Sequence, residues 1–228
     1  MNATFSRSIS ILCGAALIAL STTGTDALAK KKKDKKKKDK GDKAPAEIVE
    51  IGVSAIDDVF SPAKDILDGL NSATESLNSV NANIVKAMGL GEDSSIADAI
   101  ALMKEKAAGK FKVEIKDLKP MVGVADDAGD DVKAAVAAIN DGGQAMVDAI
   151  KTLKAIPDQA KAVIAAAKAV PSTAPAALKE AGLKPTEIPG KLKAVGGNVK
   201  AVGGIPAAAK GTLDAAMANI ELIKGLKG

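Results

Sequence analysis

Apolar residues recur every three or four positions along most of the chain, which is the spacing of helices that bury one face. The clearest run follows Pro62. Two series of apolar residues each repeat every seven positions there, and together they form a seam of Ala63, Ile66, Leu70, Ala73, Leu77, Val80 and Ile84. The seam predicts a long helix that ends at residues 89–91. Packing against the chain's own helices is the favoured interpretation, and a coiled coil with a partner chain is the alternative.

Further helices are predicted on either side of the seam. Residues 48–60 form a first apolar run, which ends at residues 61–62 because serine caps a helix and proline favours its first turn. Another helix is predicted to start within residues 93–95, where three residues can act as a cap. Residues 122–182 predict several shorter helices. Their breaks are predicted at residues 140–143, Pro157 and Pro171.

One short segment has the period of a strand instead. Residues 110–117 alternate polar and apolar, with Phe111, Val113 and Ile115 on one side. Pro120 closes the segment, and the sequence offers no obvious partner strand. We therefore interpret it as an extended connector, with an edge strand that pairs between chains as the alternative.

The C-terminal part is rich in glycine and lysine. The five residues starting at Lys193 recur from Lys200, and both copies end in a glycine pair. Each glycine costs a helix up to ~1 kcal/mol relative to alanine. This region is therefore expected to be loose in water and to become helical on a surface, whereas residues 207–226 predict a final amphipathic helix.

The N-terminus has the features of a secretory signal. Residues 9–20 form an apolar core after Arg7, and Ala27, Leu28 and Ala29 match a small-residue cleavage pattern. The core is shorter than the roughly 20 residues of a spanning helix. Cleavage after Ala29 would give a secreted or periplasmic protein. Lysines directly after a signal resist export, so a poorly exported chain or an uncleaved anchor is the alternative.

Charge divides the rest of the chain into three parts. Residues 30–43 hold ten lysines against three aspartates, residues 44–150 hold nine lysines against nineteen acidic residues, and residues 151–228 hold twelve lysines against five acidic residues. The net charge of +4 therefore conceals a basic, acidic and basic order. Because residues 30–43 contain no apolar side chain, a disordered tail is predicted over residues 30–46.

The chemistry available after residue 29 is narrow. This part of the chain has no Cys, His, Trp, Tyr or Arg, so the usual general bases and activated nucleophiles are missing. We expect no enzymatic activity, no cofactor and no small-molecule substrate. The densest acidic cluster is Asp126, Asp127, Asp130 and Asp131. It is interpreted as charge at a helix N-terminus, with a divalent cation site as the alternative.

The lysines point to an anionic partner. Polybasic segments bind anionic surfaces, so we expect association with an anionic lipid or envelope polymer. The residues expected to bind it are Lys30, Lys31, Lys32, Lys33, Lys35, Lys36, Lys37, Lys38, Lys191, Lys193 and Lys200. Nucleic acid is not expected, because residues 30–228 contain no arginine and only two aromatic residues, and the middle of the chain is acidic. A solvated tail that binds nothing is the plainest alternative for the lysine tract.

These patterns together predict an all-α protein, an elongated helical bundle or hairpin of amphipathic helices. Four regions are predicted: a signal over residues 1–29, a tail over 30–46, an acidic helical region over 47–153 and a basic helical region over 154–228. The expected function is non-enzymatic lipid binding or coating at a surface. A self-associating structural protein, possible as a homo-oligomer, is the alternative, followed by a membrane-perturbing toxin. The proline-punctuated, Ala- and Lys-rich C-terminal part resembles exchangeable apolipoproteins and late-embryogenesis-type helices in style.

Overall fold

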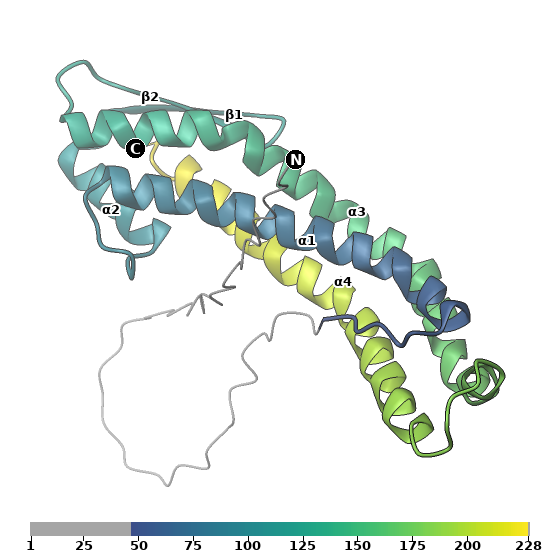
Figure 1. The fold of residues 1–228 in the computed structure, drawn as a ribbon. Helices are drawn as coiled ribbons and strands as arrows, with labels where there is room; N and C mark the ends of the chain where they lie inside the picture. Colours follow the sequence, from purple (N-terminus) through teal and green to yellow (C-terminus); the bar gives the residue numbers. More distant parts are fainter. Residues whose placement is uncertain (1–46, 228) are drawn as a thin grey trace, which may run out of the picture. The chain divides into compact units, whose positions relative to one another are not determined.

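Four helices and one hairpin make up the part of the chain that the structure, a computed structural model, describes, residues 47–227. The predicted signal and lysine tail lie outside the described residues. The elements are α1 (Ser54–Ala87), α2 (Ile96–Lys106), β1 (Phe111–Lys116), β2 (Lys119–Val124), α3 (Asp130–Glu180) and α4 (Ile188–Lys224). Helices dominate, which confirms the predicted helical class (Figure 1).

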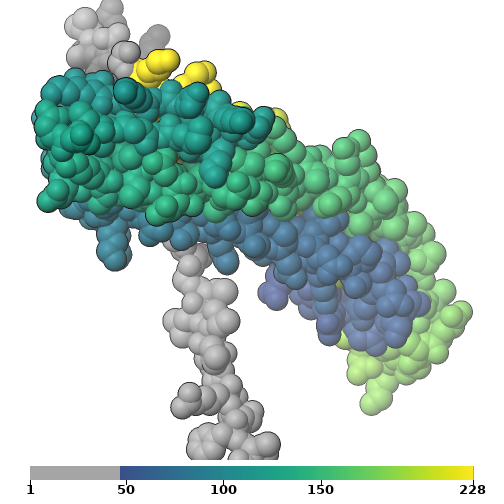
Figure 2. Space-filling view, turned by 90° about the horizontal axis from the view of Figure 1, so that it is seen from above, coloured from purple at the N-terminus to yellow at the C-terminus, as the bar shows by residue number. Residues whose placement is uncertain are grey.

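Helix α3 is the element that the others pack against. It contacts α1 and α4 along much of its length, and β2 lies against its first half. Helix α1 runs beside α3 in both views (Figure 1 and Figure 2). Gly69 of α1 lies near Thr152 of α3, and Val80 lies near Gly142, so the two helices are antiparallel. The apolar residues between these helices belong to one core cluster.

All seven seam residues of α1 are buried within this core. Leu70 and Leu77 are only 2% and 4% exposed, and Ala63 and Ile84 are fully buried. The seam thus lies among the chain's own helices rather than on an outer face. Burying a leucine side chain contributes about 2 kcal/mol relative to exposure, so this stripe is a major source of stability.

The predicted helix break at residues 61–62 is wrong, because α1 starts at Ser54 and continues through Pro62. A proline inside a helix costs about 3 kcal/mol, mainly because the carbonyl four residues earlier loses its hydrogen bond. That carbonyl belongs to Asp58, which is exposed and can bond to water. Phe60 and Ala63, at 1% and 0% exposure, flank the proline and supply burial that offsets its cost.

Helix α2 begins where its sequence predicted. Ser95 is the N-cap, and it forms a capping box with Asp98: the Ser95 Oγ accepts the Asp98 N–H at 3.2 Å, and the Asp98 carboxylate accepts the Ser95 N–H at 2.8 Å. The Ser95 hydroxyl also donates to this carboxylate. These hydrogen bonds lower the pKa of Asp98. The reciprocal bonds satisfy backbone donors that an uncapped helix start leaves open.

The interpretation of residues 110–117 as an unpaired connector is wrong. They form β1, which pairs antiparallel with β2 through the two-residue turn of Asp117 and Leu118. Both turn residues have positive φ, 51° and 67°, as a two-residue hairpin turn requires. Pro120 was taken as the end of the extended segment, but it lies within β2. Its missing N–H costs the ladder nothing when that position faces away from β1.

The predicted breaks in residues 122–182 are also wrong. Helix α3 is continuous over 51 residues and contains Pro157, Pro171 and Pro175. It also crosses the predicted boundary between residues 153 and 154. Fully buried residues stand close to each proline, for example Ile156 at 1% exposure and Ala174 at 0%. Packing of this face therefore outweighs the local cost of proline.

Helix α4 differs from the expectation of a loose C-terminal region. It is one helix through both glycine pairs, and it buries Val195, Val202 and Ile205 against the core. The apolar residues recur every three or four positions across the glycines. Tertiary contact thus supplies the stability that glycine-rich helices lack on their own.

Gly142 sets how closely α1 approaches α3. A Cβ atom at this position would lie 2.6 Å from Cγ1 of Val80. We expect Gly142→Ala to lower the free energy of unfolding by about 2 kcal/mol, because overpacking outweighs the ~1 kcal/mol gained in helix propensity. Urea unfolding followed by circular dichroism would measure this change.

Two further variants test the cause. Combining Gly142→Ala with Val80→Ala should cost less than the sum of the two single changes, because the clash is gone. Gly196→Ala is the matched control, since a Cβ there meets nothing within 4 Å. It should stabilise the protein by about 0.5 to 1 kcal/mol. Equal effects at both glycines would contradict close packing at Gly142.

Candidate functional site

The extended segment before α1, residues 47–53, lies against α4. Its residues Ile48, Ile51 and Val53 are buried. The side chain of Asn198, which is 1% exposed, forms hydrogen bonds with both the N–H and the C=O of Val49. Its Oδ1 accepts the Val49 N–H at 2.9 Å, and its Nδ2 donates to the Val49 carbonyl at 2.7 Å. This paired contact, called the Asn198 clamp below, fixes the start of the described chain to α4.

Two more residues hold the same segment. The carboxylate of Asp57 accepts hydrogen bonds from the N–H groups of Ile51, Gly52 and Val53 at 2.7, 2.8 and 3.0 Å. These bonds tie the segment to the first turn of α1. The ammonium group of Lys191 donates to the carbonyl of Ile51. Gly52 has a φ of +81°, which favours glycine, and a Cβ atom at this position would lie 3.8 Å from the Nζ of Lys191. Lys191 is therefore used inside the chain.

Lys193 and Lys200, the other two predicted binding lysines on α4, are exposed. They are seven residues apart and so lie on the same side of the helix. Neither forms an ion pair with any residue in the range 47–227. Within the described part of the chain, no acidic side chain neutralises these two charges.

Glycine forms much of the surface around these two lysines. A Cβ added at any of these glycines would meet nothing within 4 Å, so each faces open space: Gly190, Gly196, Gly197, Gly203, Gly204 and Gly211. No acidic residue occurs between Ile188 and Leu213. We call this outer side of α4 the glycine-lysine face. It combines unpaired positive charge with a helix backbone that few side chains shield.

The Asn198 clamp attaches Val49, which follows the predicted lysine tract in the sequence, to α4. Asn198 lies between Lys193 and Lys200 in α4, and Val49 lies only eleven residues after Lys38. The two hydrogen bonds therefore hold the start of the described chain on α4, although Val49 and Asn198 are 149 positions apart.

Sequence reasoning missed a second series of exposed lysines on α3. Lys154, Lys161 and Lys168 are all exposed and are seven residues apart. Lys161 pairs with Asp158 at 2.7 Å, and this hydrogen bond raises the pKa of Lys161 and lowers that of Asp158. Lys154 and Lys168 have no such partner among the residues described. Their seven-residue spacing was the signal that could have identified them.

Two of the four carboxylates in the acidic cluster near the start of α3 pair with lysines. Asp131 pairs with Lys106, and Asp127 pairs with Lys110 at 3.1 Å. These hydrogen bonds hold the pKa values of both carboxyl groups below the ordinary value. Asp130 and Asp131 lie in the first turn of α3, where negative charge is favourable. Within the described range, no group of three or more residues is arranged to hold a metal ion.

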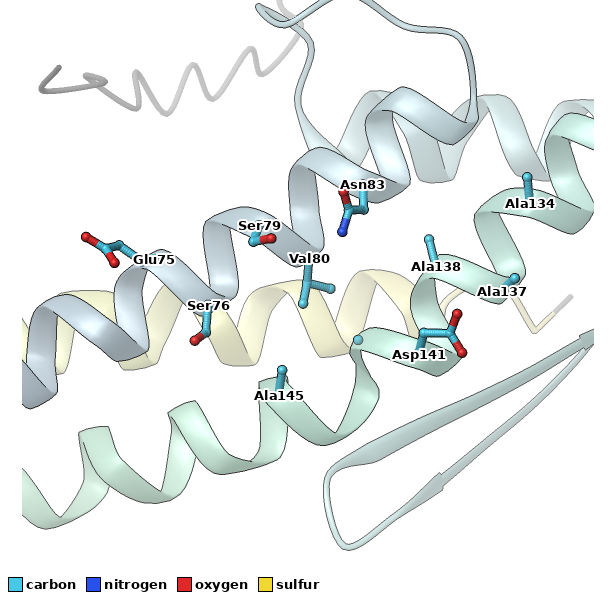
Figure 3. Close-up of a pocket in the computed structure, with 11 residues that line it drawn as sticks. Glu75, Ser76, Ser79, Val80, Asn83, Ala134, Ala137, Ala138, Asp141 and Ala145 are labelled. Atoms are coloured by element: carbon cyan, nitrogen blue, oxygen red, sulfur yellow. The ribbon is translucent and has the colours of Figure 1, made fainter. Parts of the chain in front are cut away.

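A shallow groove lies between α1 and α3 above Val80 (Figure 3). Small side chains of both helices line it, and Glu75 and Asp141 stand at its edges. The lining holds no lysine, and its two carboxylates, Glu75 on α1 and Asp141 on α3, lie apart (Figure 3). It carries no argument for a bound ligand.

None of the helices described is long and apolar enough to cross a membrane. Comparison with protein-family models, curated proteins and solved structures found no match to this chain.

Proposed function

We propose that the protein associates with an anionic lipid or envelope polymer surface through the glycine-lysine face of α4 together with the lysine tract of residues 30–38. The observation that carries this proposal is the glycine-lysine face itself, where Lys193 and Lys200 are exposed and form no ion pair within residues 47–227. Binding is non-enzymatic and places positive charge against phosphate or carboxylate groups. The bound form coats the surface or holds lipid there.

The strength of such binding follows from the number of lysines. Each lysine close to an anionic membrane contributes about 1 kcal/mol. Lys193, Lys200 and the eight lysines of the tract are therefore enough for stable association, even when only some of them reach the surface. The exposed side of α4 carries no bulky apolar residue, whereas helices that insert into the interface use Trp, Phe or Leu. The association is thus electrostatic, shallow and reversed by salt.

Self-association through the seam, the second function considered, has less support. Leu70 and Leu77 are already buried within the chain. A partner helix could reach them only if α1 separated from α3, which would expose the core. The opposite charges of the acidic and basic parts remain available for contacts between chains, but they do not specify a geometry.

Flotation of the full chain with vesicles tests the proposal. Vesicles of anionic phospholipid should carry the protein upward at low salt, and vesicles of zwitterionic phospholipid should not. Raising the salt concentration to about 1 M shortens the screening length to about 3 Å and should release the protein. Equal flotation with both vesicle types, or binding that salt does not affect, would contradict the proposal.

Matched variants locate the binding face. Lys193→Gln with Lys200→Gln should weaken binding to anionic vesicles about tenfold or more, because two favourable charges are lost. Lys86→Gln with Lys104→Gln removes two exposed lysines that have no ion pair among the described residues, but from the acidic part of the chain. This control should bind as the parent does. Equal losses in both pairs would show that net charge, rather than the glycine-lysine face, governs binding.

A further inference from the structure

The hairpin has one open edge. Asn140 of α3 binds the backbone of Val122 in β2: the Val122 N–H donates to Oδ1 at 2.8 Å, and Nδ2 donates to the Val122 carbonyl at 2.8 Å. The backbone groups of Val122 therefore point away from β1. Val113 is the residue opposite Val122 in the ladder. Val113 and Val122 therefore form a non-hydrogen-bonded pair, in which both residues direct their backbone groups away from the partner strand. The N–H and C=O of Val113 thus point to the outer edge of β1.

The two outer edges of the hairpin differ in whether their outward N–H and C=O groups have hydrogen-bond partners. The edge of β2 is closed by Asn140 and by packing against α3. On the edge of β1, the N–H of Phe111 bonds to the carbonyl of Gly109 at 2.9 Å. No group between residues 47 and 227 bonds to the outward N–H or C=O of Val113 or Ile115. An open edge of this kind is a template for another strand.

We propose that β1 pairs with β1 of a second copy of this chain, antiparallel and centred on Val113. The two hairpins then form a four-stranded sheet with Val113 opposite its counterpart and Phe111 opposite Ile115 of the second copy. The N–H and C=O of Val113 bond to those of the second Val113, and the N–H of Ile115 donates to the C=O of Phe111 in the other copy. This pairing is independent of the surface-binding proposal. It uses attraction between Lys112 and Glu114 of β1, whereas surface binding uses the lysines of α4 and of residues 30–38.

Charge complementarity selects the second copy as the partner. Lys112 and Glu114 both lie on the exposed side of β1. In the register centred on Val113, Lys112 of each copy lies directly opposite Glu114 of the other, so two opposite-charge pairs form. Such cross-strand pairs are favourable, whereas like charges directly opposite are unfavourable. At the ends of the ladder Lys110 approaches Lys116, but Lys110 is already paired with Asp127.

Other registers that use the same outward groups are less favourable. Centring on Lys112 or on Glu114 places like charges opposite each other. Centring on Ile115 does pair Glu114 with Lys116, but it sets Val113 against the turn residue Asp117, whose φ is 51°. Only the register centred on Val113 combines both charge pairs with five strand residues of each copy.

Cysteine cross-linking tests the register. The full chain carries one cysteine, Cys13, which is replaced by serine in every variant. Lys112→Cys and Glu114→Cys are prepared separately and then mixed. In a pair without backbone bonds the Cα atoms are about 4.5 Å apart, which a disulfide spans. Mild oxidation of the mixture should give a linked dimer at least several-fold faster than either variant alone. Faster linking of Glu114→Cys with Lys116→Cys would overturn the register.

Charge reversal tests the partner. Lys112→Glu alone and Glu114→Lys alone should each weaken the dimer about tenfold, since both attractive pairs become repulsive. An equimolar mixture of the two variants restores opposite charges across the ladder and should dimerise as the parent does. Sedimentation velocity over a range of concentrations measures this, and circular dichroism checks that each variant folds. A parent chain that stays monomeric, or variants that dimerise unchanged, would overturn the proposal.

Discussion

Replacing Leu70 by aspartate is expected to lower the free energy of unfolding by about 4 kcal/mol or more, because the apolar contacts are lost and a carboxylate must be buried or the helices must separate. Leu70 is 2% exposed in the centre of the seam. Domains of this size are stable by only about 5 to 15 kcal/mol, so the variant should unfold at a clearly lower temperature or fail to fold. Thermal unfolding followed by circular dichroism is the measurement.

The neighbouring residue provides a control for Leu70→Asp. Asn71 is exposed, so Asn71→Asp adds the same charge to α1 without burying it. It should change the unfolding temperature little. Leu77→Asp, one heptad later and 4% exposed, should resemble Leu70→Asp. If both leucine variants unfolded at the parent temperature, the seam would not be part of the core, and a surface for a partner helix would become the better interpretation.

Replacing Asn198 by leucine is expected to lower the free energy of unfolding by about 2 kcal/mol. The change removes two hydrogen bonds to the backbone of Val49, which is 54% exposed, and each such bond contributes about 1 kcal/mol. The loss of stability should be confined to residues 47–53 and their contact with α4, because the rest of α4 packs through other residues. Urea unfolding measures the total effect, and hydrogen exchange at the Val49 amide measures the opening of residues 47–53.

Asn219 is the matched control for Asn198. It lies on the same helix, and its side chain donates a single hydrogen bond to Asn81 at 3.1 Å. Asn219→Leu should cost much less, because no backbone group of an extended segment depends on it. Equal effects of the two substitutions would argue against the clamp.

The sequence predicted the faces of the helices better than their ends. The seven-residue repeat of the seam and the capping residues before α2 depend on local spacing, which is visible in the chain. The continuity of α3 through Pro157 and Pro171 was not visible, since it depends on burial against α1 and α4. Proline removes the same backbone hydrogen bond in every helix, and the surrounding contacts decide whether the helix continues through it.

The parts of the candidate site that depend on distant residues were also missed. Nothing in the local sequence connects Val49 with Asn198, or Val122 with Asn140, because each pair joins an extended backbone to an amide on a distant helix. The strand signal of residues 110–117 was recognised, but its partner was hidden by Pro120. The lysines of α4 were identified from composition, whereas their difference in exposure, with Lys191 bonded inside the chain, required the fold.

The Asn198 clamp also has a consequence for the time course of synthesis. Its two residues are 149 positions apart. At about 5 to 20 residues per second, roughly 7 to 30 s pass between the synthesis of Val49 and that of Asn198. During this interval the buried residues of segment 47–53 have no helix α4 to pack against. The region directly after the lysine tract is therefore the first part of the described chain to be made and among the last to reach its final contacts.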